Sequence, residues 1–210
     1  MIKLRKLEKK DLPTRVTWMN DPRVYRTMHF KPPISLERTL EWFHNRGTNR
    51  LDFVTEEDGE LLAMVGATNI DPIIKKGESY TIVNPDLKGR GIGTKALFLK
   101  SVYCFEIERV NKIWAYVDGD NTASIRMAER IGYRVEGILR QEVARENGLI
   151  DRYYLGCLEN DLKKDSFKYG IEGQAILLYD YIAENSIRCC LRSEVTARGV
   201  GRACRAGFLT

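Results

Sequence analysis

The chain has 210 residues and a net charge of +5 at pH 7, and 43% of its residues are hydrophobic and 30% charged. This length and composition predict a globular domain whose core needs neither metal nor disulfides, and the mild charge without a dense Lys/Arg tract argues against a nucleic-acid-binding protein. No apolar run approaches the roughly 20 residues that span a bilayer, and the amino-terminal residues lack the apolar region of a secretory signal.

The cysteines and histidines argue against a metal centre. The five cysteines include no C-x-x-C pair, and His29 and His44 are the only histidines. We therefore expect reduced thiols, a cytoplasmic protein and no metal site.

The first half of the sequence predicts helices and strands joined by clear turn signals. Asp11 and Ser35 stand where they can cap helices, and Glu57-Asp58-Gly59 is a turn-rich tripeptide between two apolar runs. The predicted elements are, in order, a strand over 2–7, helices over 12–20 and 36–45, a β-hairpin formed by 53–54 and 61–70, and a strand over 78–83.

The second half continues with the same mixture. We expect a helix over 93–106, a strand over 112–117, a helix over 121–131 that Gly132 ends, and strands over 133–137, 138–145 and 150–158 with a tight turn at Glu146-Asn147-Gly148. These strands and helices together predict a mixed α/β domain that ends near Leu162.

The composition changes after about Lys164. Residues 171–182 read as an amphipathic helix, and the residues beyond Ser186 are rich in arginine and cysteine without a clear period. We therefore predict a domain over 1–164 and a carboxy-terminal extension over 165–210 that is partly helical or disordered. Whether this extension has a function stays open.

Residues 88–96 read K-G-R-G-I-G-T-K-A, with glycines at every second position before a helix. Such a loop is typical of backbone amides that hold a phosphate at a helix N-terminus. A Walker A loop is excluded because Thr94 and Lys95 occur in reverse order. A Rossmann fingerprint fits from Gly91 to Ala96, but residues 85–88 separate it from the preceding strand and three strands come earlier. A glycine turn that only caps the helix is a further reading.

Two segments resemble the GNAT-type N-acetyltransferases. V-N-P-D-L-K-G-R-G-I-G-T-K-A-L looks like their acetyl-CoA motif Q/R-x-x-G-x-G/A, with Lys88 where Arg or Gln is usual. N-T-A-S-I-R-M-A-E-R-I-G-Y-R-V-E-G at 121–137 resembles their next segment, in the same order along the chain. The resemblance covers about residues 2–160 and is nearest to the branch of ribosomal-protein N-terminal and small-molecule amine acetyltransferases.

This resemblance implies a mixed, mostly antiparallel, splayed sheet flanked by helices, with acetyl-CoA as co-substrate and no metal. It implies Glu78 as the base and Ser124 as the proton donor, because Ala128 stands where many members have a tyrosine. Tyr133 falls where the family has an aromatic packing residue. The implied cofactor-binding residues are Ile82, Val83, Lys88, Gly89, Arg90, Gly91, Ile92, Gly93, Thr94 and Asn121.

The acceptor is the least readable part of the resemblance. The family builds its acceptor wall from the first helices and the last hairpin, which implies Trp18, Phe30 and Glu142 as substrate-binding residues. Trp18 also reads as a core residue, and Glu142 is a weaker rival for the base. The amine stays open between an amino sugar, an antibiotic, a polyamine and a protein N-terminus. No acidic cluster marks a strongly cationic substrate.

We therefore expect an acetyl-CoA-dependent N-acetyltransferase whose partner is an amine, with no nucleic acid and no membrane, and a homodimer stays open. Two alternatives remain at this point. One is a Rossmann-type nucleotide-binding oxidoreductase. The other is a catalytically silent CoA-binding module, which the missing tyrosine at position 128 would explain.

Overall fold

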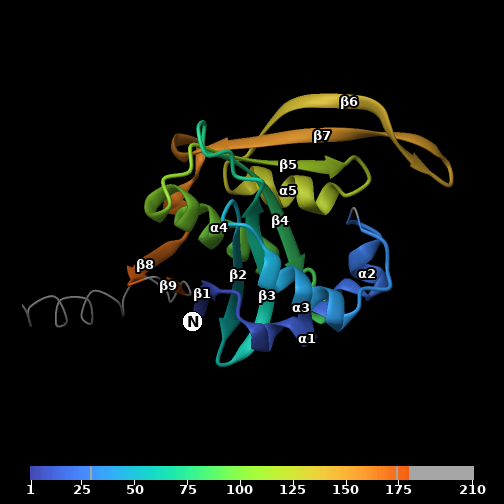
Figure 1. The fold of residues 1–210 in the computed structure, drawn as a ribbon. Helices are drawn as coiled ribbons and strands as arrows, with labels where there is room; N and C mark the ends of the chain where they lie inside the picture. Colours follow the sequence, from blue (N-terminus) through green and yellow to red (C-terminus); the bar gives the residue numbers. More distant parts are fainter. Residues whose placement is uncertain (29, 174, 180–210) are drawn as a thin grey trace, which may run out of the picture. The chain divides into compact units, whose positions relative to one another are not determined.

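The computed structural model describes residues 1–28, 30–173 and 175–179. Their strands form one nine-stranded sheet in the order β6-β7-β5-β4-β3-β2-β1-β9-β8 (Figure 1). The strands are β1 (Ile2–Lys6), β2 (Leu51–Glu57), β3 (Glu60–Thr68), β4 (Lys76–Val83), β5 (Lys112–Asp118), β6 (Arg134–Arg145), β7 (Gly148–Leu158), β8 (Lys168–Glu172) and β9 (Ala175–Tyr179). Neighbouring strands in this sheet pair antiparallel, except β4 and β5, which pair parallel. The predicted mixed, mostly antiparallel sheet is confirmed.

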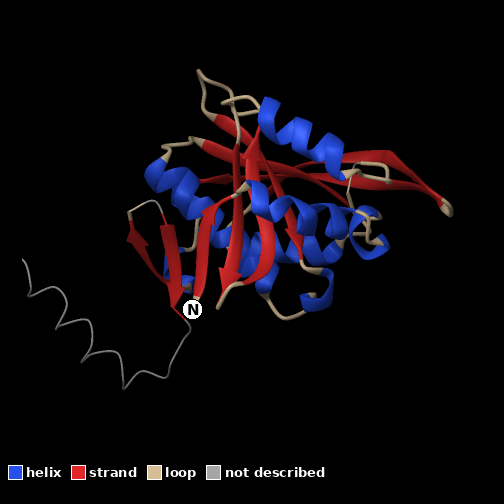
Figure 2. Ribbon diagram, turned by 60° about the horizontal axis from the view of Figure 1, so that its bottom comes forward, coloured by secondary structure: helices blue, strands red, loops and turns tan. Residues whose placement is uncertain are grey.

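Helices cover both faces of this sheet (Figure 2). The helices are α1 (Leu12–Met19), α2 (Pro22–Tyr25), α3 (Leu36–Asn45), α4 (Ile92–Val102) and α5 (Thr122–Arg130). Alternation along a strand sends neighbouring side chains to opposite faces. Phe53 accordingly belongs to the core under α4 and α5, whereas Val54 belongs to the core under α1 and α3.

Most predicted helix ends are confirmed. Ser35 Oγ accepts a hydrogen bond from Arg38 N at 3.2 Å and caps α3. Asp11 does not cap α1 with its side chain. Its carboxylate instead accepts from Arg5 Nη1 at 2.8 Å and Nη2 at 2.9 Å and from Glu8 N at 2.9 Å. An ion pair with β1 therefore outcompetes the local cap.

The predicted strands over 133–137 and 138–145 are one long strand, β6. Its pairing with β7 shifts register between Val135 and Gly137 and again between Leu139 and Val143. Such irregularities let one strand continue through a bend. The sequence break at Gly137 therefore marks a bulge and not a chain turn. Figure 1 shows β6 and β7 extending past their neighbours.

The predicted helix over 171–182 is wrong within the described residues, because β8 and β9 form a hairpin there. β9 pairs antiparallel with β1 through Ile2↔Leu178, Lys3↔Leu177 and Leu4↔Ile176. A short apolar run is ambiguous between helix and strand, and the free edge of β1 decides the outcome. The compact unit runs from Met1 to Tyr179, so Lys164 lies inside it. The rest of the predicted extension lies outside the described residues.

Candidate functional site

The two parallel strands at the centre of the sheet separate part-way along their length. β4 and β5 pair through Lys76↔Lys112, Gly77↔Ile113 and Glu78↔Trp114, and their pairing ends at Glu78 and Trp114. A cavity of about 280 Å³, the splay cavity, lies where they part. Both strands supply its walls, from Glu78 to Thr81 and from Ala115 to Asp118.

A second cavity, the loop cavity, lies at the N-terminus of α4 and has a volume of about 290 Å³. Gly91 caps the helix in a left-handed conformation, with φ of +76°, and Gly89 has φ of +84°. No atom lies within 4 Å of a Cβ built on either glycine, so the loop leaves open space beside its backbone. The unpaired amides of a helix N-terminus and its dipole stabilise an anion there.

Gly93 is needed for close packing and not for an unusual backbone conformation. A Cβ at Gly93 would lie 2.7 Å from Met127 Sδ and 3.2 Å from Val83 Cγ2. The glycine therefore lets α4 approach α5 and β4 closely, which narrows the space between the two cavities. The regular spacing of the three glycines thus combines two backbone turns with one packing requirement.

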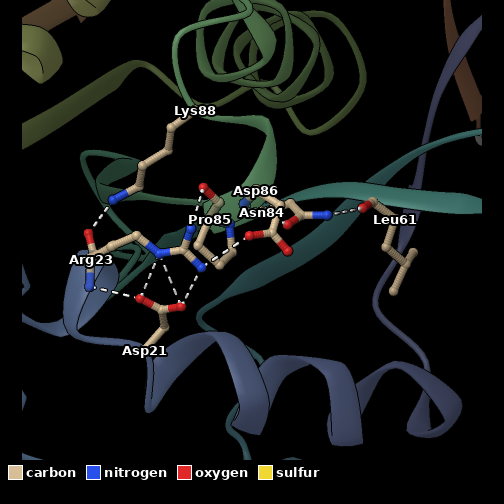
Figure 3. Close-up of polar contacts among 7 residues, drawn as sticks. All are labelled: Asp21, Arg23, Leu61, Asn84, Pro85, Asp86 and Lys88. Atoms are coloured by element: carbon tan, nitrogen blue, oxygen red, sulfur yellow. Dashed lines mark hydrogen bonds and ion pairs between the residues drawn. The ribbon is translucent and has the colours of Figure 1, made fainter.

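A polar network ties α2 to the segment before the loop (Figure 3). The Arg23 guanidinium forms ion pairs with Asp21 at 2.7 Å and Asp86 at 3.0 Å, and its Nη1 donates to the Pro85 carbonyl at 3.4 Å. The Lys88 ammonium donates to the Arg23 carbonyl. This network holds α2 beside the loop, and the residues that follow Arg23 along the chain complete one wall of the loop cavity.

The two cavities meet, because six residues line both of them. They are Thr27, Met28, Thr81, Asn121, Ser124 and Met127. A ligand in the loop cavity and another in the splay cavity would therefore come together at this boundary. Asn121 Oδ1 also accepts from Ser124 N at 3.3 Å, so the start of α5 is capped at the same point.

A family model for the acetyltransferase (GNAT) domain matches residues 2–134. The chain belongs to the GNAT acetyltransferase family. It is 29% identical over 143 residues to a spermidine N(1)-acetyltransferase of Escherichia coli (strain K12), which covers 67% of this chain and 77% of the relative. It is 31% identical over 105 residues to a putative ribosomal N-acetyltransferase, YdaF, of Bacillus subtilis (strain 168). That match covers 50% of this chain and 52% of the relative.

Solved structures confirm the GNAT fold. A spermidine N-acetyltransferase from Vibrio cholerae, solved in complex with CoA and spermine, superposes with a TM-score of 0.71 at 23% identity. The match covers 76% of this chain and 96% of that one. The chain is thus an acetyl-CoA-dependent N-acetyltransferase. A mostly antiparallel sheet gives the Rossmann alternative no support, and the relatives give none to a silent module.

The predicted cofactor-binding residues of this GNAT protein converge, with one exception. Ile82, Val83, Lys88, Gly89, Gly91, Ile92, Gly93, Thr94 and Asn121 all line the loop cavity. Arg90 is exposed and is not among the lining residues. Burial lowers the pKa of Lys88. Because the Lys88 ammonium is bound to a carbonyl of α2, it positions the loop in this structure.

The two predicted catalytic residues both line the splay cavity and come from different elements. Glu78 stands at the last paired position of β4, and its Oε2 accepts from Asn69 Nδ2 at 3.2 Å. Ser124 lies in the first turn of α5 and lines both cavities. Ala128 lines the splay cavity one turn further along, so no hydroxyl projects from that position.

Of the three predicted substrate-binding residues, the structure brings only Phe30 to the splay cavity. Trp18 is 5% exposed and packs in the core under α1 and α3, so its position is that of a core residue. Glu142 is exposed on β6 and lines neither cavity. It falls in the irregular part of the strand, between Leu139 and Val143.

The sequence reasoning missed the β5 wall of the splay cavity. Tyr116 and Asp118 line it, and Asp118 is buried. Its carboxylate accepts from Arg145 Nη2 and Arg152 Nε, both at 2.8 Å, which offsets its charge. The signal that could have found these residues is the alternation along β5, where Trp114, Tyr116 and Asp118 stand at every second position between apolar residues.

Proposed function

We propose that this GNAT enzyme binds acetyl-CoA in the loop cavity and acetylates a primary amine that enters the splay cavity. The observation that supports this most directly is that the two cavities share residues where β4 leaves β5. A donor and an acceptor placed on either side of Ser124 would be close enough for direct transfer. Holding both reactants in this way removes much of the entropic barrier.

The loop residues fit a pyrophosphate. Gly89 and Gly91 adopt positive φ with open space beside them, so their backbone can approach a ligand closely. Ile92, Gly93 and Thr94 at the start of α4 line the same cavity, and the unpaired amides of a helix N-terminus favour an anion. Ile82 and Val83 follow the loop cavity along the end of β4, where backbone amides would polarise the acetyl carbonyl.

The acceptor must be a neutral amine when it attacks. Acetyl-CoA, when bound, supplies the thioester. In this proposal the Glu78 carboxylate takes a proton from the amine, whose nitrogen then forms the new bond to the carbonyl carbon. The thiolate that leaves takes a proton from the Ser124 hydroxyl, and the proton held by Glu78 returns to the Ser124 oxygen through solvent. Both residues face the splay cavity, and Ser124 also faces the loop cavity.

The charges in the splay cavity favour a small-molecule amine whose reacting end has one positive charge. Glu78 and Asp118 both line it, but Asp118 is paired with two arginines, which leaves the Glu78 carboxylate to attract a cation. The relatives named as spermidine acetyltransferases also favour a small amine. Any further positive charges of a polyamine would have to lie outside this cavity.

A panel of amines tests the proposal by release of free CoA thiol. It includes spermidine, an amino sugar and a peptide with a free N-terminus. Glu78→Gln should lower kcat by about 10²-fold or more, as expected for loss of a general base, with the KM for acetyl-CoA unchanged. Glu142→Gln is the matched control, because Glu142 lies outside both cavities. Full activity of Glu78→Gln would refute the role of Glu78.

The donor site has its own test. Gly91→Asp places a carboxylate in the open space of the loop, so the Kd for acetyl-CoA should rise at least tenfold through charge repulsion and steric blockage. Gly59→Asp is the control, because Gly59 has a similar φ of +84° and equally open surroundings but lies in the β2–β3 turn. Equal affinity of both variants would exclude the loop as the pyrophosphate site.

A further inference from the structure

A lysine lies in the core of the molecule. Lys100, on α4, has 0% of its surface exposed. Its Nζ donates to Ser79 Oγ at 2.8 Å and to Tyr133 Oη at 3.1 Å. Among the described residues, no Asp or Glu forms an ion pair with it. Burying an ammonium without a carboxylate partner is costly, so this position asks for a reason beyond packing.

Both hydrogen-bond partners of Lys100 face the proposed acceptor site. Ser79 and Tyr133 line the splay cavity. Ser79 follows Glu78 directly on β4, so their side chains leave the strand toward opposite faces of the sheet and line the cavity from different sides. Lys100 therefore lies behind the wall against which the amine would bind. A single side-chain hydroxyl, of Ser79 or of Tyr133, stands between the buried Lys100 Nζ and the splay cavity.

The two branches from Lys100 differ in where they lead. Tyr133 Oη lies 3.3 Å from Ser101 Oγ, and the Ser101 hydroxyl donates to the Leu97 carbonyl at 2.8 Å. That branch ends at a carbonyl within α4. Ser79 accepts from Lys100, and its rotatable hydroxyl can donate its proton to Tyr133 Oη, with which it also interacts, or toward the cavity. Ser79 is therefore the branch that can pass a proton to or from the cavity.

The surroundings leave Lys100 as the group of this cluster that titrates near neutral pH. Burial lowers its pKa to about 8. Burial raises the pKa of the two thiols that face it, Cys104 on the same helical segment to about 11 and Cys157 on β7 to about 12. It also raises the pKa of Tyr133. Neutral and charged Lys100 are both accessible at the pH where an amine is acetylated.

We propose that Lys100 is a positioning residue that takes up a proton from the acceptor amine through Ser79. This role rests on the proposed function. An ammonium that becomes an amide loses two protons from nitrogen, and Glu78 takes one of them. Ser79 Oγ takes the other while its own hydroxyl proton moves to the lone pair of neutral Lys100 Nζ. Lys100 is left charged, and the same path in reverse returns the proton to solvent after the products leave.

The decisive measurement is the pH profile of kcat/KM for the best amine of the panel. The wild-type profile should contain a limb with an apparent pKa near 8, the value set by burial of Lys100. Lys100→Met keeps the length of the side chain and removes the titrating group. It should abolish this limb and lower kcat about tenfold or more, with the KM for acetyl-CoA within about twofold of wild type.

Matched variants separate the two branches and keep the test independent of folding. Ser79→Ala should abolish the limb, and Ser79→Thr, which restores a hydroxyl, should recover it. Tyr133→Phe should keep it, because that branch ends inside α4. A limb that survives in both Lys100→Met and Ser79→Ala overturns the relay and leaves the proposed function intact. Absence of turnover by the wild type over the whole panel overturns both.

Discussion

The β8–β9 hairpin should be essential for stability, although it lies beyond the last family motif. Ile176, Leu177 and Leu178 of β9 are 0%, 5% and 1% exposed. Burying each side chain contributes about 1.5–3 kcal/mol, so the three together contribute roughly 5–9 kcal/mol. The whole stability of a domain is about 5–15 kcal/mol. Removing the hairpin should therefore eliminate most of the free energy of unfolding.

Removing the segment after Lys164 would also remove aromatic contacts with Phe98, which lowers the free energy of unfolding further. Phe98 of α4 lies 4.7 Å from Phe167 and 5.5 Å from Tyr169, measured between ring centroids. A chain that ends after Lys164 lacks both partners and also exposes the edge of β1, where β9 normally pairs. A chain that ends after Tyr179 keeps every one of these contacts. The two truncations are therefore a matched pair.

Urea unfolding followed by tryptophan fluorescence measures the effect. Residues 1–179, which keep every element that the structure describes, should unfold in one cooperative transition and provide the reference midpoint. Residues 1–164 should show a greatly lowered midpoint or no cooperative transition. Ile176→Ala in the full-length chain should cost about 2–5 kcal/mol, as a cavity in a packed core does. A midpoint of residues 1–164 equal to that of residues 1–179 would refute this reasoning.

Three further outcomes are expected from the structure. Gly132→Ala should lower the unfolding free energy by more than about 2 kcal/mol, because φ is +113° and the new Cβ would lie 1.9 Å from the Asp161 carbonyl oxygen. An unchanged urea midpoint would contradict this. Tyr80→Phe removes a hydrogen bond of 2.7 Å to the buried Asp52 carboxylate and should cost about 1–3 kcal/mol in the same assay. The pKa of Lys100, about 8 against 10.5, means that the folded state binds fewer protons than the unfolded state between these pH values. Lys100 should therefore add on the order of 3 kcal/mol to the free energy of unfolding across that window. The raised pKa values of the Cys104 and Cys157 thiols act in the opposite direction, so the quantity to measure is the difference between the wild type and Lys100→Met, which should grow by this amount.

The donor side of the site could be predicted from the sequence because its signals are local. Glycines that adopt positive φ, a helix that begins directly after them and an asparagine that caps the next helix act within a few residues of one another. The structure places nine of the ten predicted cofactor residues around one cavity. Arg90 is the exception, because its side chain is exposed and does not line this cavity, and local sequence does not fix the direction of a side chain on a loop.

The acceptor side could be predicted only in part. Phe30 lines the splay cavity, but Trp18 packs in the core and Glu142 lies elsewhere on β6. The wall is built instead by β5, whose residues become available because β4 turns away after Glu78. Strand separation is a long-range property of the sheet, and a strand sequence does not report which neighbour it lacks.

The sequence by itself therefore determined the family, the order of most elements before β8 and the loop that suits a pyrophosphate, since each depends on local conformation or on residue patterns. Only the tertiary structure decided where the domain ends, because β9 becomes a strand by pairing with β1, at the other end of the chain. The tertiary structure also decided that Lys100 is buried. A lysine on an apolar helix reads as an ordinary surface residue until β4 and Tyr133 close around it. Burial, and with it the lowered pKa, arises from packing between segments far apart in the sequence.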